Sequence, residues 1–259
     1  MGLLSHLKFA LKVMLPPKIF IRFLAWKRGY PEPELKLIKI LSDKNKISID
    51  VGASEGLYTA RLFLNSKKCI SFEPRIEASI ELAKLTAGLI PPVQIETVAL
   101  SDFTGEAQLK IFVDDAGRST IEKNNLIENQ GQIEIVPTIV KKLDDYDFND
   151  AIGFIKIDVE GQEEAVLRGA EKLLKRDSPI LMVEIEERHK CNSIKNVSEY
   201  LSSLSYSGFF LQNDHLVSLN NFSVYEHQDI NKLNLKGEYI NNFIFITNGK
   251  KNNIKKLLK

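Results

Sequence analysis

The chain has 259 residues, 44% of them hydrophobic, so it can bury a full core without a metal ion or a disulfide. Its 35 basic and 34 acidic side chains nearly cancel, which removes any overall electrostatic argument for nucleic acid as a partner. The two cysteines, Cys69 and Cys191, lack the spacing of a metal site and are typical of a reducing compartment. We therefore expect a cytoplasmic α/β protein that binds a neutral or modestly charged molecule.

Residues 1–45 are predicted to form a helical extension, and residues 2–29 of it contain no acid. Lys8, Lys12 and the prolines at 16 and 17 divide this stretch into pieces too short to span a bilayer, and no signal-peptide cleavage site follows. It contains a helical stripe of Leu4, Leu7, Leu11 and Met14 or Leu15. Two readings stay open. The stripe packs on its own domain or on a partner subunit, as in a homodimer, or it lies on the anionic inner face of a membrane.

Helices and strands alternate in the next part of the chain. The apolar spacing predicts helices at 34–43, 57–64 and 78–88 and strands at 47–51, 69–73 and 93–100. Such an alternation calls for a parallel sheet with right-handed crossovers.

The second half of the chain mixes two kinds of strand. Residues 107–113 and 133–140 alternate like antiparallel strands around a polar stretch at 114–120. Buried strands are predicted at 153–161 and 179–186 with a helix at 163–175 between them, and closing strands at 206–212 and 241–247. We place the main domain at 46–249 and expect a solvated, lysine-rich tail at 250–259.

The loop after the first strand reads DVGASEG, residues 50–56. Gly52 and Gly56 allow a tight turn and a close approach of the backbone to a ligand. A dinucleotide site needs a third glycine beside the pyrophosphate, whereas Glu55 stands where a pyrophosphate would approach. The loop therefore disfavours NAD and favours a cationic nucleoside cofactor among nearby carboxylates. S-adenosylmethionine fits this description.

Acids stand at the ends of four predicted strands, where ligands bind in an open parallel sheet. These acids are Asp50, Glu73, Asp158 with Glu160, and Glu184 with Glu186. Glu73 ends the second strand and can accept both ribose hydroxyls of a nucleoside. The alternative is that Glu73 is only an acid before a helix. The end of the third strand, Ala99 to Ser101, would border the adenine.

Five segments occur in an order that resembles the FkbM-type S-adenosylmethionine-dependent methyltransferases. They are DVGASEGLYT, SFEP, VALSD, FIKIDVEGQEEAVLRGA and VEIEERH, between residues 47 and 189. The resemblance implies a Rossmann-like class I methyltransferase fold with a mostly parallel seven-stranded sheet flanked by helices. It also implies O-methylation of hydroxyls, often on sugars or polyketide-like natural products. One departure is Ser54, where the family usually has asparagine.

On these grounds we expect the enzyme to bind S-adenosyl-L-methionine and to methylate a hydroxyl of a small molecule or glycan. The expected cofactor-binding residues are Asp50, Gly52, Ala53, Ser54, Gly56, Tyr58, Thr59, Glu73, Ala99, Leu100 and Ser101. A rival hypothesis is a non-catalytic module that keeps the fold as a scaffold at a membrane-associated complex.

Methyl transfer to a weakly acidic hydroxyl requires a proton acceptor or a metal ion. Asp158, Glu160 and Glu184 end neighbouring strands on the cofactor side of the sheet. Asp158 and Glu184 are expected either to hold Mg²⁺ or to act as base and orienting group. His189, just past a strand, is the other candidate base, because histidine titrates near working pH.

Candidate substrate contacts come from two polar segments. Arg118 and Ser119 lie in the polar stretch at 114–120, which is placed as an insertion over the cleft. Arg188 follows the strand that ends in Glu184 and Glu186. We expect these three side chains to orient a polar acceptor. The identity of that acceptor does not follow from the sequence.

Overall fold

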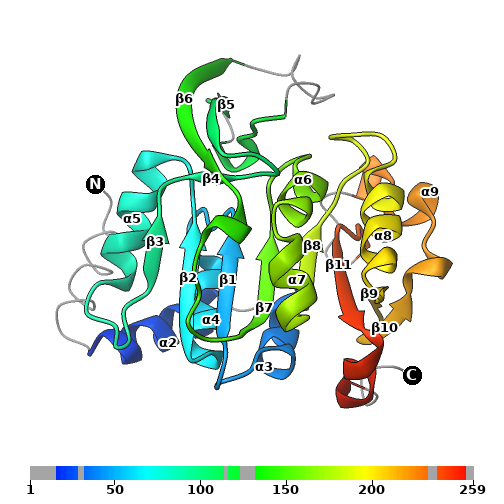
Figure 1. Cartoon of the computed structure of the whole chain (residues 1–259), viewed down its shortest axis with the longest axis horizontal. Coiled ribbons are helices and arrows are strands. Elements are labelled where there is room, and N and C mark those ends of the chain that lie inside the picture. Colours follow the sequence, from blue (N-terminus) through cyan, green and yellow to red (C-terminus); the bar gives the residue numbers. More distant parts are fainter. Residues whose placement is uncertain (1–15, 29–31, 114–115, 123–131, 233–237, 255–259) are drawn as a thin grey trace.

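The structure is a computed structural model that describes residues 16–28, 32–113, 116–122, 132–232 and 238–254. Its centre is an eight-stranded sheet in the order β10-β9-β11-β8-β7-β1-β2-β3, with helices on both faces (Figure 1). The strands of this sheet are β1 (Ile47–Val51), β2 (Lys68–Phe72), β3 (Gln94–Glu96), β7 (Ile152–Ile157), β8 (Ile180–Glu184), β9 (Tyr206–Gln212), β10 (His215–Ser218) and β11 (Asn242–Thr247). A smaller sheet is formed by β4 (Ala99–Leu100), β6 (Ile133–Lys141) and β5 (Gly105–Phe112).

Helices cover the two faces of the large sheet (Figure 1). They are α2 (Pro17–Arg28), α3 (Ile38–Leu41), α4 (Leu57–Asn65), α5 (Ile76–Thr86), α6 (Glu163–Arg168), α7 (Glu171–Asp177), α8 (Ser193–Ser203) and α9 (Val224–His227), with 3₁₀ turns η1 (Pro33–Leu37), η2 (Ala116–Arg118), η3 (Leu143–Asp145), η4 (Leu219–Asn221), η5 (Ile230–Lys232) and η6 (Asn248–Ile254). Successive residues of a strand face opposite sides of the sheet. In β8, Leu181 and Val183 therefore join the apolar cluster with α6, α7 and α8, while Met182 joins the cluster with α2, α3 and α4.

Five neighbouring strands, β3, β2, β1, β7 and β8, are parallel. Strand β1 is buried along its whole length and pairs with β2 on one side and β7 on the other. From β1 the chain continues to β2 and β3 on one side, and it returns later to form β7 and β8 on the other side. Ligands of α/β sheets bind at such a switch in strand order. The predicted parallel core with helical crossovers is confirmed.

The sheet is mixed and has one strand more than the predicted seven. Strand β11 runs antiparallel to both β8 and β9. Strand β10 is the additional one, because residues 206–218 form a hairpin through Asn213 and Asp214. Both turn residues have positive φ angles, 49° and 66°, and Asn and Asp tolerate this left-handed conformation well.

The described part of the N-terminal extension packs on the domain. Phe20 and Ile21 of α2 are buried, and α2 contacts α4 and α5. The segment 34–43, predicted to be one helix, forms η1 and α3, and its residues Leu35, Leu37, Ile38 and Leu41 are all buried. The stripe from Leu4 to Leu15 lies outside the described residues, so membrane contact and a homodimer stay predictions. No helix in the described ranges is both long and apolar enough to cross a bilayer.

Three predicted elements have different ends in the structure. The strand at 93–100 divides into β3 and β4, which belong to different sheets. The helix at 163–175 divides into α6 and α7 at Gly169, where a Cβ would lie 2.0 Å from the carbonyl oxygen of Ser101. The tail was predicted to be solvated from residue 250. This is wrong for its first part, because Ile254 is buried and Lys250 donates to the carbonyl of Ser178. The domain boundaries at 46 and 249 stay predictions.

Candidate active site

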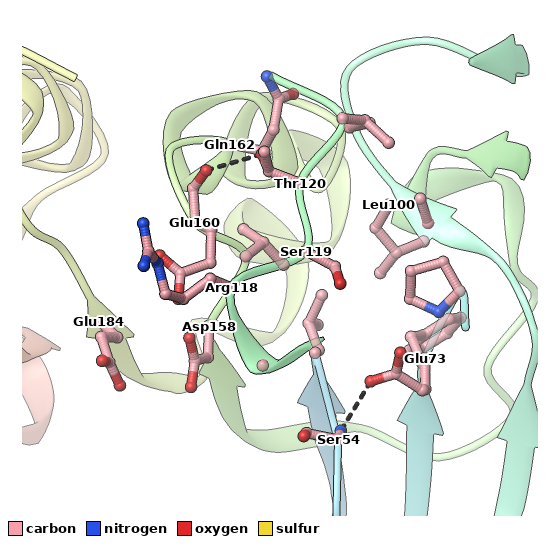
Figure 2. A pocket seen from close by; sticks show the side chains of 18 of the residues that line it. Ser54, Glu73, Leu100, Arg118, Ser119, Thr120, Asp158, Glu160, Gln162 and Glu184 are labelled. Carbon is pink, nitrogen blue, oxygen red and sulfur yellow. Dashed lines mark hydrogen bonds between the residues drawn. The ribbon is translucent and has the colours of Figure 1, made fainter. Parts of the chain in front are cut away.

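A cavity of about 520 Å³ opens at the carboxyl ends of β1, β2, β7 and β8. Residues 117–121 and parts of β4 and β5 complete its wall. Figure 2 shows Ser54, Glu73 and Leu100 at one end and Glu160 and Glu184 at the other. The strand ends that carry the predicted acids therefore surround one cavity.

At Gly52 the loop after β1 packs directly against the backbone of Asp158. The φ angle of Gly52 is +80°, and a Cβ at this position would lie 1.8 Å from the carbonyl oxygen of Asp158. Only glycine fits both the left-handed backbone and this contact. Gly56 has a φ angle of +75° at the start of α4, and a Cβ there would lie 2.5 Å from the side chain of Leu82. The two glycines therefore fix the loop shape.

Ser54 also adopts a left-handed conformation, with a φ angle of 44°. Asparagine tolerates this conformation better than serine. This difference gives a physical reason for the family preference for asparagine at this position. The backbone N–H of Ser54 donates to Glu73 Oε2 at 2.7 Å, which joins the loop to the end of β2.

Glu73 is held in place by several donors. Besides Ser54, the backbone N–H and the Nε of Arg75 donate to Glu73 Oε1 at 3.0 and 2.8 Å. Nη2 of Arg75 donates to Ser54 Oγ at 3.0 Å, and its Nη1 donates to the carbonyl of Ala116 at 2.7 Å. Because these donors occupy much of the carboxylate, a ribose at Glu73 has to replace contacts of the Arg75 side chain. Arg75 could not be selected from the sequence, since a residue after a Glu-Pro pair carries no motif.

Asp50 lies beneath the loop and not on the cavity wall. It is buried and accepts a hydrogen bond from Thr59 Oγ1 at 2.6 Å, and Thr59 is also 2.9 Å from Ser71 Oγ. Burial raises the pKa of Asp50 to about 6. These contacts join the start of α4 to β1 and β2.

The cavity wall includes part of the predicted cofactor set. Gly52, Ser54, Glu73, Ala99 and Leu100 line it. The other predicted cofactor residues do not line it and are buried, and they are Asp50, Ala53, Gly56, Tyr58, Thr59 and Ser101.

Asp158 and Glu184 share the far end of the cavity with a buried lysine. Nζ of Lys156 lies 3.9 Å from Asp158 Oδ2 and 3.3 Å from Glu184 Oε2. The Lys156 side chain is 1% exposed, whereas the side chains of Asp158 and Glu184 keep 34% and 20% of their area exposed. The two carboxyl groups therefore face the cavity, and the ammonium lies behind them.

This arrangement shifts all three pKa values. Burial raises the pKa of Asp158 to about 7, because the Lys156 charge offsets the burial only in part. Burial and the neighbouring Asp158 hold the pKa of Glu184 well above its usual range. Burial alone would lower the pKa of Lys156, but Asp158 and Glu184 outweigh it and raise that pKa. Near neutral pH the two carboxyl groups share protons as a coupled pair beside a permanent cation.

The prediction of Mg²⁺ at Asp158 and Glu184 has no support. The Lys156 ammonium already provides the positive charge between the two carboxyl groups. Among the residues that the structure describes, no group of three or more His, Cys, Asp or Glu side chains has the arrangement of a metal site. Two carboxylates beside a lysine are a poor donor set for Mg²⁺, which is normally held by oxygen ligands in octahedral geometry.

His189 is buried behind the cavity wall, with 2% of its surface exposed. Its Nε2 lies 2.7 Å from Glu160 Oε2 and 3.8 Å from Glu186 Oε1. Burial alone would lower the pKa of His189, but the interactions with these two acids, first with Glu160, raise it to about 9. The ring is therefore a cation at neutral pH, which makes it an unfavourable proton acceptor.

Glu186 is the centre of a second ion pair. Arg188 donates to both of its carboxylate oxygens, and Tyr239 donates to Oε2 at 2.6 Å. Burial would raise the pKa of Glu186, but the interaction with His189 and the hydrogen bonds from Arg188 and Tyr239 lower it to about 2. Arg188 lines the cavity as predicted, but its guanidinium is committed to Glu186.

Arg118 and Ser119 also line the cavity, as predicted. Several lining residues were not predicted, among them the polar residues Arg75, Thr120, Gln162 and Asn241. Asn241 directly precedes β11. An antiparallel strand begins at the edge where parallel strands end, so the Asn-Asn pair before FIFIT was a usable signal once the direction of β11 is known.

The sequence pattern of the Methyltransferase FkbM domain matches residues 50–207. Among solved structures, the FkbM methyltransferase from Methylobacillus flagellatus KT superimposes with a TM-score of 0.52 at 17% identity, over 78% of this chain and 44% of that one. This chain thus spans less than half of that protein, and the likeness shows the fold. No curated protein matches the chain.

Two other similar structures were solved with SAH. SMU.1697c, a putative methyltransferase from Streptococcus mutans, has a TM-score of 0.47 at 14% identity, over 82% of this chain and 94% of that one. The O-methyltransferase from Bacillus cereus has a TM-score of 0.46 at 12% identity, over 93% and 96%. The FkbM pattern covers more than half of the sequence and includes the strand ends around the cavity. The chain belongs to the FkbM methyltransferase family.

Proposed function

We propose that this protein transfers a methyl group from S-adenosylmethionine to a hydroxyl of a sugar, a glycan or a related natural product. The observation that carries the proposal is a single cavity with two different acidic ends. Glu73 is fixed at one end, and the coupled pair of Asp158 and Glu184 is at the other. Family membership supports methyl transfer, and the resemblance described above supports a hydroxyl acceptor.

The Glu73 end fits an adenosyl cofactor. Gly52 lines the cavity, and its lack of a side chain lets the loop pack against the carbonyl of Asp158. Glu73 offers carboxylate oxygens to ribose hydroxyls, as acids at the end of the second strand do in related folds. The apolar side chains of Val98 and Leu100 provide a surface for the adenine. When bound, S-adenosylmethionine supplies a methyl group on a positively charged sulfur.

The Asp158 end fits the removal of a proton from the acceptor. A sugar hydroxyl is a very weak acid, so its proton has to leave as the new bond forms. The pKa of about 7 for Asp158 lies near the working pH, where a general base is most effective. Lys156 stays charged and stabilises the ionised form of the pair. We assign the proton acceptor to Asp158 and the orienting role to Glu184.

The remaining polar residues hold the acceptor end in shape. Glu160 has a φ angle of 47°, and its carbonyl accepts a hydrogen bond from Thr120 Oγ1 at 2.8 Å. Its carboxylate is paired with His189. These contacts connect residues 116–122 to the end of β7, so the wall above Asp158 is fixed from both sides.

The first experiment is isothermal titration of the purified protein with S-adenosylmethionine, S-adenosylhomocysteine and NAD. Saturable binding of the two adenosyl ligands and none of NAD is the expected result. Transfer of label from methyl-labelled S-adenosylmethionine to a panel of sugars and glycans follows, with mass spectrometry to locate the methyl group on oxygen. Absence of adenosyl binding would refute the proposal. Binding without transfer to any acceptor would favour the non-catalytic scaffold, and methylation on nitrogen would refute the hydroxyl assignment.

A further inference from the structure

Arg118 lies on the acceptor end of the cavity. Figure 2 shows its side chain on the same side as Asp158, Glu160 and Glu184, across the cavity from Glu73. Its guanidinium carbon lies 4.9 Å from the centre of the Phe112 ring, and Phe112 is buried. This cation–π contact helps to hold the guanidinium in place.

The backbone that follows Arg118 is also fixed. Thr120 exchanges two backbone hydrogen bonds with Lys110 of β5, at 2.9 and 3.0 Å. The hydroxyl of Thr120 donates to the carbonyl of Glu160 at 2.8 Å. The segment that carries Arg118 is therefore held by β5 and by the loop after β7.

Two donors of Arg118 are buried without a hydrogen-bond partner among the described residues, namely Nε and Nη2. These two atoms form one edge of the guanidinium, and their N–H bonds are parallel. That edge matches two oxygens of one carboxylate or phosphate. Buried donors without partners are rare in folded proteins, and each one calls for an explanation. A ligand that brings two oxygens to this edge is such an explanation.

The other cations of the cavity wall are already neutralised. Arg75 is paired with Glu73, and Arg188 is paired with Glu186. Glu160 is paired with the protonated His189, and the pair of Asp158 and Glu184 lies beside Lys156. Among the described cations in and behind the wall, Arg118 is the one that forms no ion pair with a carboxylate. An anionic group on a ligand would supply that partner.

We propose that Arg118 binds an anionic group, a carboxylate or a phosphate, that the methyl acceptor carries near its reacting hydroxyl. The preferred acceptors are then acidic or phosphorylated sugars and not neutral ones. This inference rests on the proposed function for the identity of the acceptor. The pairing of Arg118 with an oxyanion can be tested without it. The same chemistry has a second source, the carboxylate at the amino-acid end of the cofactor, and the experiment has to distinguish the two.

The test follows the Nε–H signal of Arg118 by NMR in ¹⁵N-labelled protein. This signal is assigned by its absence from the spectrum of Arg118→Lys. Sodium acetate and inorganic phosphate are titrated at constant ionic strength against a chloride control. The titrations use free protein, protein with 5′-methylthioadenosine, which lacks the amino-acid end, and protein with S-adenosylhomocysteine. Arg168 is the matched control, because it stacks on Tyr200 at 4.5 Å but is paired with Glu164 away from the cavity.

A saturable shift of the Arg118 signal in all three forms, with no shift of Arg168, is the expected result. Absence of a shift beyond the chloride control would overturn the proposal. A shift that S-adenosylhomocysteine abolishes and 5′-methylthioadenosine preserves would assign Arg118 to the cofactor carboxylate and overturn its role toward the acceptor. Failure of both adenosyl ligands to bind would count against the proposed function, while the titration of free protein would still decide the anion site.

A kinetic test follows once an acidic acceptor is identified. Arg118→Gln should raise the KM for that acceptor by about 10- to 100-fold, the usual effect of losing a charge-assisted bidentate contact. The KM for S-adenosylmethionine should stay unchanged. For the neutral amide of the same acceptor, wild type and variant should have the same KM. An equal effect on acid and amide would overturn the proposal.

Discussion

The ammonium of Lys156 lies 2.8 Å from the side-chain oxygen of Asn242. Lys156 is on β7 and Asn242 is on β11, so this hydrogen bond connects two strands that β8 separates. The ring of Tyr58 lies 4.8 Å from the same ammonium, and the hydroxyl of Tyr58 donates to Glu32. Side chains from the N-terminal extension, α4 and three strand ends thus surround one buried cation beneath the cavity.

We expect Lys156→Met to destabilise the protein by about 3 kcal/mol or more, the usual result of removing one partner from a buried ion pair. The loss should be largest at alkaline pH, where Asp158 is ionised and has no cation beside it. Urea unfolding at pH 6 and pH 8 measures both effects. Lys67→Met is the control, because the pair of Lys67 with Asp150 is exposed and is worth roughly 0–1 kcal/mol. Equal losses in the two variants would refute the buried-cation interpretation.

The two ends of the cavity should separate binding from turnover. Glu73→Ala should weaken binding of S-adenosylhomocysteine by about 10- to 100-fold, because ribose contacts to a charged acceptor are lost. Asp158→Asn should leave that binding nearly unchanged and lower kcat by about 10²- to 10⁴-fold, the usual contribution of a general base. Calorimetry and single-turnover kinetics give the two quantities. The reverse pattern would exchange the roles of the two residues.

Turnover should also depend on pH through Asp158. Its pKa of about 7 means that the carboxyl group is protonated, and inactive as a base, below that pH. We expect kcat of the wild type to fall as pH decreases through 7, and the residual kcat of Asp158→Asn to lack this decrease. Measurements of kcat at increased solvent viscosity serve as a control, because they show whether product release limits turnover. A wild-type profile that is flat from pH 5 to pH 9 would refute Asp158 as the base.

His189 should affect stability more than catalysis. Its pKa is about 9 in the folded protein and 6.5 for an ordinary histidine, so the folded state holds the proton more tightly. The stabilisation is fully present below pH 6.5 and is lost as pH rises through 9. His189→Gln should therefore lower the free energy of unfolding at pH 6 and have less effect at pH 9.5. His215→Gln, at an exposed position of β10, is the control. A larger loss at alkaline pH would contradict this sign.

The sequence predicted the strand ends because a short apolar strand that ends in an acid is a local pattern. It therefore identified Gly52, Glu73, Asp158 and Glu184 on one cavity wall. The charge state of His189 was not predictable in this way. A lone histidine titrates near neutral pH, and the carboxylates that shift it come from the loop after β7 and from the segment just after β8.

The predicted Mg²⁺ site and the number of strands in the sheet also depend on contacts between segments that are distant in the sequence. Lys156 lies within the strand predicted at 153–161, but only the side-by-side order of β7 and β8 places its ammonium beside two carboxyl groups. The additional strand β10 depends on a two-residue turn that tolerates positive φ angles. Contacts between strands depend on more than one segment of the sequence. The hydrophobic periodicity within a single segment therefore does not reveal them.

Gly52 gives the sharpest test of the loop geometry. Gly52→Ala places a Cβ 1.8 Å from the carbonyl oxygen of Asp158 at a φ angle of +80°, and both the contact and the backbone conformation are unfavourable. We expect a loss of about 3–5 kcal/mol in the free energy of unfolding, the range typical of backbone strain combined with a steric clash.

Gly249→Ala is the matched control for this change, because no atom lies within 4 Å of a Cβ built there. Its effect should stay within about 0.5 kcal/mol, as for most surface substitutions. Urea unfolding compares the two variants, and binding of S-adenosylhomocysteine is measured on the folded fraction. If Gly52→Ala were as stable as the control, β1 and β7 could not approach each other as closely as the structure has them, and the shape assigned to the cofactor end of the cavity would be wrong.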